Sequence, residues 1–174
     1  MGFELHSELN TSRLSPNETK QYIIFFLRRA ETAFREYKSA RRTLIDYVND
    51  GSKRVSVYFE VLFHIETCIA QMWQAFDQTR NFIKTSSGED RKLYERGDGS
   101  PYERLNTLYN IGRYAGNNIP EDSTLPIWLT NVGVEAGDAK ISFSELADLL
   151  QEIGNWADKL SNPPVPIRQS TTET

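Results

Sequence analysis

Hydrophobic side chains recur with a helical period along residues 16–50. The segment opens with SPNE, in which Ser15 can cap a helix, Pro16 suits its first turn and Glu18 can complete a capping box. Two seven-residue apolar series follow: Ile23, Ala30, Tyr37 and Leu44, and then Phe26, Ala33, Ala40 and Tyr47. Four heptads predict a helix roughly 50 Å long with a seam for a partner helix. The turn signal of residues 49–51, Asn-Asp-Gly, predicts its end.

A second helix is predicted from Val55 to Ile83, with Ser52 placed to cap it. Its apolar residues cover most of the helical circumference, so it is expected to be buried on several sides. The short connection predicts that the two long helices run antiparallel. The breadth of the apolar surface is more than three neighbouring helices can cover, which predicts a homodimer.

The rest of the chain alternates loops with shorter elements. Residues 85–100 are polar and contain glycine, and they predict a loop. Pro101 begins a third helix that is expected to end near Gly116. Residues 125–135 contain β-branched side chains around Asn131 and predict a small hairpin. Ser142 and Glu145 form a second capping box, which predicts a final helix through residue 160.

These elements predict an all-α, up-and-down bundle of about four main helices with a small β-like hairpin near 125–135. We expect an N-terminal arm at residues 1–14 and a single helical domain at residues 15–160. The Pro- and Thr-rich residues 161–174 are expected to form a disordered tail.

Composition narrows the functional classes. The chain has 174 residues, of which 39% are hydrophobic and 25% charged, as in a folded globular domain. A net charge of −4 disfavours a protein whose main task is to bind phosphate backbones, and no DNA partner is expected. The single cysteine, Cys68, excludes an intrachain disulfide and predicts a reducing compartment. Without a signal peptide or an apolar run of membrane-spanning length, we expect a cytoplasmic protein with no membrane partner.

No metal or cofactor is expected. The stretch GDAKISFSEL is spaced like the end of a calcium-binding EF-hand loop, but Val134 and Ala136 would occupy ligand positions and carry no side-chain oxygen. Glu60 and His64 can share a helix face, yet the further carboxylate–histidine pairs of a di-iron bundle are missing. No phosphate-binding loop or dinucleotide fingerprint is present. Arginines recur every seven residues at positions 28, 35 and 42. They could form a ridge for phosphate backbones, but such a pattern is more typical of a solvated helix face.

The third helix carries the clearest candidate binding surface. Its sequence, LNTLYNIGRYAGNN at residues 105–118, places an apolar stripe on one face and a polar stripe on another. Asparagine is a mediocre helix former, so several on one face are not explained by helix propensity. Amide, guanidinium and phenol groups in a row can bind phosphates, bases or a partner helix. The candidate ligand-binding residues are Asn106, Asn110, Arg113, Tyr114 and Asn117.

The stretch YERLNTLYNIGRYAGNNIP, followed by LPIWLTNVGVEAG, resembles helical proteins of the HEPN superfamily (higher eukaryotes and prokaryotes nucleotide-binding). The resemblance is carried by residues 101–118 and extends to the two long helices before them. It implies an all-α bundle that dimerises, as in bacterial toxin–antitoxin, abortive-infection and CRISPR systems. Active members of the family cut RNA without metal. They use an arginine, then commonly an asparagine, then a histidine four to six residues after the arginine, and the two copies of the motif meet at the dimer interface.

In this chain the catalytic motif is degenerate. Asn110 matches the polar residue, but Tyr109 stands at the arginine position and Tyr114 at the histidine position. A phenol is a poor general base at neutral pH. Arg104 lies on the other side of the helix from Asn110, and Arg113 occupies the wrong place in the motif. We therefore predict no catalytic residues.

Three hypotheses follow. The first is a non-catalytic HEPN-like protein that binds RNA, a nucleotide or a partner protein in a bacterial stress or defence context. The second is a metal-independent endoribonuclease of the toxin type that uses Asn110, Arg113 and Tyr114 in altered roles. The third is a structural interaction protein whose resemblance in the third helix is accidental.

Overall fold

The computed structural model describes residues 14–51, 54–114 and 126–161, which form four helices and a small antiparallel sheet. The helices are α1 (Pro16–Asp50), α2 (Val55–Ser87), α3 (Pro101–Tyr114) and α4 (Phe143–Ser161). The strands are β1 (Trp128–Leu129), β2 (Gly133–Ala136) and β3 (Ala139–Ser142), in the order β1-β2-β3. The four predicted main helices are confirmed. The predicted hairpin is present as β1 and β2, and β3 adds a third strand that the sequence reasoning missed.

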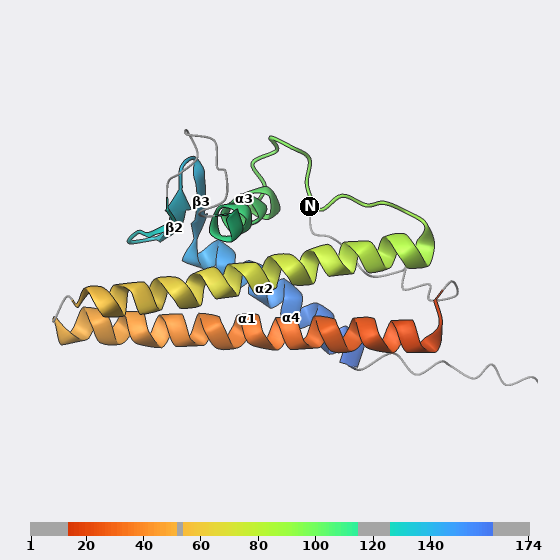
Figure 1. Cartoon of the computed structure of the whole chain (residues 1–174), viewed down its shortest axis with the longest axis horizontal. Coiled ribbons are helices and arrows are strands. Elements are labelled where there is room, and N and C mark those ends of the chain that lie inside the picture. The colour runs from red at the N-terminus through yellow and green to blue at the C-terminus, as the bar shows by residue number, and fades with distance from the viewer. Residues whose placement is uncertain (1–13, 52–53, 115–125, 162–174) are drawn as a thin grey trace, which may run out of the picture.

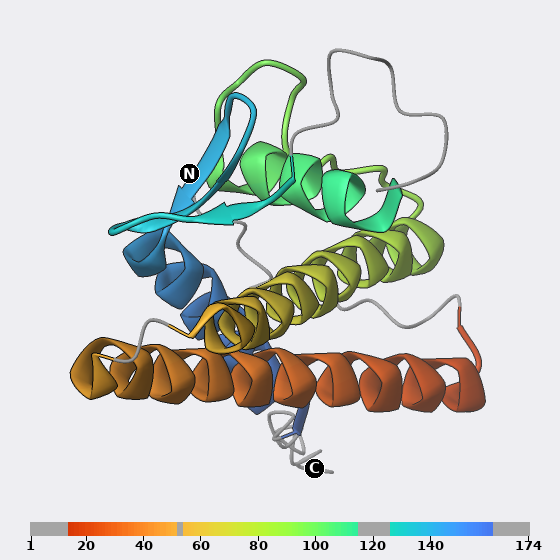
Figure 2. The ribbon, with the colours of Figure 1, turned by 60° about the vertical axis from the view of Figure 1, so that its left-hand side comes forward.

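Helices α1 and α2 lie side by side and run in opposite directions, as predicted (Figures 1 and 2). Four members of the two heptad series, Phe26, Ala30, Ala33 and Ala40, are buried, and three of these are small enough to let the helices approach closely. The predicted capping box of α1 is present, because Ser15 Oγ accepts from the Glu18 N–H and Glu18 accepts from the Ser15 N–H.

The start of α2 differs from the prediction. Its N-cap is Arg54, with no capping bond from the side chain, whereas Ser52 lies outside the described residues. The Arg54 carbonyl accepts the N–H groups of Val57 and Tyr58, so the first turn is closed by the backbone alone. At its other end α2 continues to Ser87, and Gly88 with φ of +82° ends it.

Helix α4 crosses the α1–α2 pair obliquely, and α3 lies against α2 beside the sheet (Figure 2). Trp156 of α4 closes the core, with its ring 5.4 Å from that of Phe76 on α2 and 6.3 Å from that of Phe26 on α1. The same Phe76 ring meets Tyr102 of α3 edge-on at 5.1 Å. Helix α2 therefore packs against all three other helices, as its broad apolar surface predicted.

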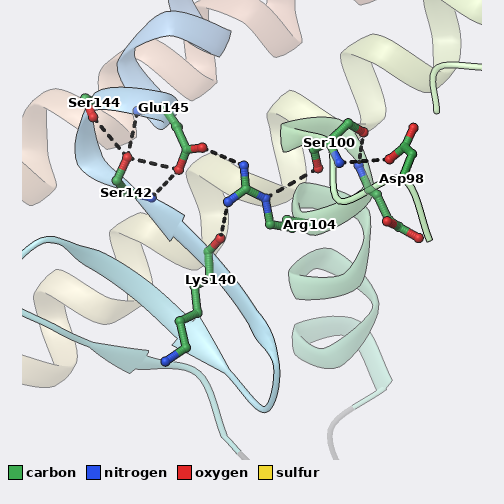
Figure 3. A network of polar contacts seen from close by, with 8 residues as sticks. Asp98, Ser100, Arg104, Lys140, Ser142, Ser144 and Glu145 are labelled. Atoms are coloured by element: carbon green, nitrogen blue, oxygen red, sulfur yellow. Dashed lines mark hydrogen bonds and ion pairs between the residues drawn. The ribbon is translucent and has the colours of Figure 1, made fainter. Parts of the chain in front are cut away.

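Arg104 joins α3 to the sheet and to the start of α4 (Figure 3). Its guanidinium donates to the Glu145 carboxylate at 2.5 Å and to the Lys140 carbonyl at 3.1 Å. Glu145 also accepts from the Ser142 N–H at 2.9 Å, while Ser142 Oγ accepts from the Glu145 N–H at 3.1 Å. The second predicted capping box is thus present. Because Arg104 is used in this junction, it lies away from the Asn110 face.

A carboxylate–imidazole pair links the two long helices. Glu36 Oε2 of α1 lies 2.7 Å from His64 Nδ1 of α2, and the two side chains are only 12% and 21% exposed. The hydrogen bond from His64 lowers the pKa of Glu36. A lowered pKa means that this contribution to stability is complete above the ordinary Glu pKa and is lost as pH falls through the lowered value.

We expect Glu36→Gln to lower the free energy of unfolding by about 1.5 kcal/mol at pH 6, since it replaces a hydrogen bond to a charged carboxylate with a weaker one to a neutral amide oxygen. The difference from the unmodified protein should shrink as pH falls below the ordinary Glu pKa and through the lowered one, because the carboxylate then becomes protonated in both states. Urea denaturation between pH 3 and 6 measures it. Glu31→Gln, at an exposed position on the same helix, serves as the control and should change little at any pH. A Glu36→Gln difference that stays constant with pH would contradict the assignment.

Candidate functional site

A groove of about 640 Å³ opens between α2 and α3. Residues of both helices line it: Phe63, Glu66, Ala70 and Gln74 from α2, and Tyr109 and Arg113 from α3. Ile127, just before β1, lines its remaining side. The groove therefore combines an apolar wall with a carboxyl, an amide, a phenol and a guanidinium group.

Tyr109 contacts two of the other hydrogen-bonding side chains that line the groove, Gln74 and Arg113. Its ring lies 6.3 Å from that of Trp73, and its hydroxyl oxygen accepts from Arg113 Nη1 at 3.1 Å and from Gln74 Nε2 at 3.5 Å. The Arg113 guanidinium also lies 5.9 Å from the centre of the Tyr109 ring, which is within cation–π range. Tyr109 thus orients Arg113 along the groove.

The Gln74 amide is oriented from the opposite side. Arg29 of α1 donates to Gln74 Oε1 and, at 3.2 Å, to Gln71 Oε1. With its oxygen engaged by Arg29, Gln74 presents its NH₂ group toward Tyr109. A polar chain from α1 through α2 to α3 therefore holds two of the groove's hydrogen-bonding groups in place.

Two of the three asparagines of the predicted polar stripe point away from the groove. Asn110 Nδ2 donates to Asn106 Oδ1 at 3.1 Å, and Asn106 Nδ2 donates to the Tyr94 hydroxyl at 2.5 Å. Tyr94 belongs to the segment between α2 and α3, and its ring lies 6.1 Å from that of Trp73. Asn106 and Asn110 thus connect α3 to that segment, whereas Arg113 of the same stripe faces the groove. The structure does not describe the side chain of Tyr114, and Asn117 lies outside the described residues.

Glu66 is the unusual group of the groove. Its carboxyl is half-buried, and burial raises its pKa above the ordinary Glu range. No residue of the described ranges donates a hydrogen bond or lends a positive charge to this carboxyl. Taking a carboxylate out of water without a partner is unfavourable. The site therefore presents a half-buried carboxyl that accepts no hydrogen bond from the described residues.

The two other candidate residues from the sequence, His64 and Cys68, have contacts that indicate a structural role. His64 pairs with Glu36 and not with the exposed Glu60. Cys68 is buried, and burial raises its pKa to about 12, as expected of an inert thiol. Within the described ranges, no three His, Cys, Asp or Glu side chains form a group that could hold a metal ion.

Two further patterns are accounted for by the fold. Val134 and Ala136, which would be calcium ligands in an EF-hand, are buried in β2. The three arginines of the seven-residue repeat on α1, at positions 28, 35 and 42, are exposed, as a solvated face requires. No helix of the described segments has the length and apolar character needed to cross a membrane.

The sequence reasoning missed Phe63, Glu66 and Gln74. A signal was present, because Glu66, Ala70 and Gln74 follow one another at four-residue spacing and so share one face of an otherwise apolar helix. Polar groups flanking a small residue on such a face indicate a recess. Which element covers that recess depends on tertiary packing.

Compared with protein-family models, curated proteins and solved structures, the chain shows no match.

Proposed function

We propose that this is a HEPN-like helical protein that binds nucleotides, free or at an RNA end, in the α2–α3 groove without cutting RNA. The observation that carries the proposal is the groove itself, which joins an aromatic wall, Phe63, to the Arg113 guanidinium on the helix that resembles the family motif. Aromatic rings stack on bases, and a guanidinium binds phosphate. In the family's bacterial settings, such a protein would act as a binding or regulatory partner in stress or defence.

A recess for one nucleotide agrees with the acidic composition better than a surface for a long RNA does. Binding of many phosphates needs a basic excess, which a net charge of −4 does not supply. A single base recognised by stacking and hydrogen bonds needs only local complementarity. Tyr109 supports the non-catalytic role, because its hydroxyl accepts hydrogen bonds from Gln74 and Arg113 and serves to position them.

The proposal includes the HEPN-type bundle and a homodimer. Val55, Phe59 and Phe63 follow one another at four-residue spacing on α2 and are 67%, 57% and 63% exposed. We name this row the apolar stripe. Exposed aliphatic and aromatic side chains in one row are typical of an interaction surface. Because Phe63 belongs to both the apolar stripe and the groove, a dimer formed along the stripe would bring the two grooves close to its interface.

The first experiment places the purified protein with an end-labelled, mixed-sequence RNA in EDTA, and reads fluorescence anisotropy and fragment length from the same tube. Binding without cutting is the expected result. Cutting that disappears in Tyr114→Phe would overturn the non-catalytic proposal in favour of the metal-independent ribonuclease. If neither the RNA nor mononucleotides in calorimetry bind at modest salt, the groove does not bind nucleotides, and a structural interaction role replaces the proposal.

We expect Phe59→Ser to convert the dimer into a monomer, because it places a hydroxyl in the centre of the apolar stripe. At an exposed position the substitution should change the monomer's stability by less than about 0.5 kcal/mol. Multi-angle light scattering over a range of concentrations measures the mass. The matched control is Phe25→Ser on α1, where the phenylalanine is 49% exposed and lies outside the stripe. If the unmodified protein is a monomer at high concentration, the dimer must be abandoned.

A further inference from the structure

The Glu66 carboxyl lines the groove, is half-buried, and accepts no hydrogen bond from the described residues. Arg113 and Gln74 are each oriented by Tyr109, and Gln74 is also held by Arg29. Glu66 has no comparable contact within the described residues. A ligand that brings hydrogen-bond donors to this carboxyl would compensate for its burial.

The immediate surroundings of Glu66 suit a flat ring. Phe63 lies one helical turn before it and Ala70 one turn after it, and both line the groove. Across the groove, Gly112 of α3 presents no side chain, and among the described residues a Cβ placed there would contact only the Ile127 side chain, at 3.6 Å. An aromatic wall, a small residue and a glycine leave a slot with a carboxyl at its edge, in which a base can stack on Phe63.

The bases differ in what they offer to a carboxylate. Guanine presents two adjacent donors, N1–H and the N2 amino group, which match the two oxygens of one carboxylate. On the same edge, adenine and cytosine place an acceptor beside their amino group, and uracil flanks its single N–H with two carbonyl oxygens. A carboxylate opposite those edges gains one hydrogen bond and meets at least one repelling acceptor.

We propose that the groove selects guanine nucleotides, with the Glu66 carboxylate accepting hydrogen bonds from guanine N1–H and N2–H. This proposal rests on the proposed nucleotide-binding function and adds its base specificity. In this arrangement Phe63 stacks on the base, and Arg113, which lines the groove from α3, binds the phosphate. Glu66 is then the specificity-determining residue, and its position on α2 explains why the resemblance in α3 does not include it.

Titration calorimetry with GMP, IMP, AMP and UMP tests this proposal. GMP should bind most tightly. IMP, which lacks only the N2 amino group, should bind at least about tenfold more weakly, because a site built around a hydrogen bond strongly rejects a ligand without it. Equal binding of all four would overturn guanine selection while leaving nucleotide binding intact. Binding of none would overturn both, so the two proposals can be told apart.

The variant Glu66→Gln assigns the selectivity to its residue. A glutamine has one acceptor oxygen in place of two, so GMP binding should weaken at least about tenfold, while IMP binding should change much less. Glu60→Gln, an exposed position on the same helix and outside the groove, should leave all four affinities unchanged. A thermal melt of each variant confirms that it is folded. If Glu66→Gln keeps the full preference for GMP over IMP, Glu66 does not read the base.

Discussion

Replacing Gly133 by alanine is expected to destabilise the protein by about 3 kcal/mol or more, because β2 and β3 leave no room for a side chain at this position. An added Cβ would lie 2.0 Å from the Ile141 carbonyl oxygen and 2.6 Å from the Ser142 Cα. Both obstacles are backbone atoms of the paired strand, so no rotamer change relieves them. Relief requires that β2 move away from β3.

Such a movement would extend beyond the sheet. Gly133 pairs with Ser142, the residue that caps α4, and the neighbouring Val132 carbonyl accepts the Phe143 N–H at 2.8 Å. If β2 moved away from β3, the first turn of α4 would also lose these contacts. Urea denaturation followed by circular dichroism gives the free energy of unfolding.

Gly112→Ala is the matched control for this substitution. A Cβ at Gly112 would make an ordinary contact of 3.6 Å with the Ile127 side chain. In a helix, alanine is favoured over glycine by about 0.5–1 kcal/mol, so this variant should be slightly stabilised. A Gly133→Ala protein as stable as the unmodified one would show that β2 and β3 are not so close.

Replacing Glu145 by alanine is expected to lower the free energy of unfolding by about 2–3 kcal/mol, from the combined loss of a capping bond and a charge-assisted bond. The carboxylate serves two elements at once, since it accepts from the Ser142 N–H at the start of α4 and from Arg104 of α3 (Figure 3). Its removal leaves the Arg104 guanidinium, 29% exposed, without its carboxylate partner.

The pH dependence separates this effect from simple truncation. Partial burial raises the pKa of Glu145, but the Ser142 N–H and the Arg104 guanidinium outweigh it and lower the pKa overall. The contribution to stability is therefore complete above the ordinary Glu pKa and is lost as pH falls through the lowered value. The difference in free energy of unfolding between the unmodified protein and Glu145→Gln should therefore decrease as pH falls. Urea denaturation between pH 3 and 7 measures this difference.

Glu135→Ala is the control for this second substitution. Glu135 lies on β2 and forms an exposed pair with Lys140, whose side chain is 68% exposed, at 3.2 Å. Surface pairs of this kind contribute little, so the variant should lose less than about 0.5 kcal/mol. Equal losses in Glu135→Ala and Glu145→Ala would contradict a special role for the Arg104 junction.

Much of the helical framework was predictable because its signals are local. Ser15 with Glu18, and Ser142 with Glu145, fix helix starts through bonds between residues three positions apart. The heptad series of α1 likewise identifies its buried seam from spacing alone. The third strand was missed because Ala139–Ser142 is short and has little strand character without β2 beside it.

For the candidate site as well, local features were predictable from the sequence and contacts between elements were not. The sequence by itself determined that α3 has a polar stripe with tyrosines at positions 109 and 114 beside it. It could not determine which stripe members face a recess. Tertiary structure decided that, by pairing Asn106 with Tyr94 twelve residues away and by placing Tyr109 and Arg113 opposite Glu66 and Gln74 of α2. Helical spacing fixes which residues share a face, but only the packing of one helix against another decides what that face meets.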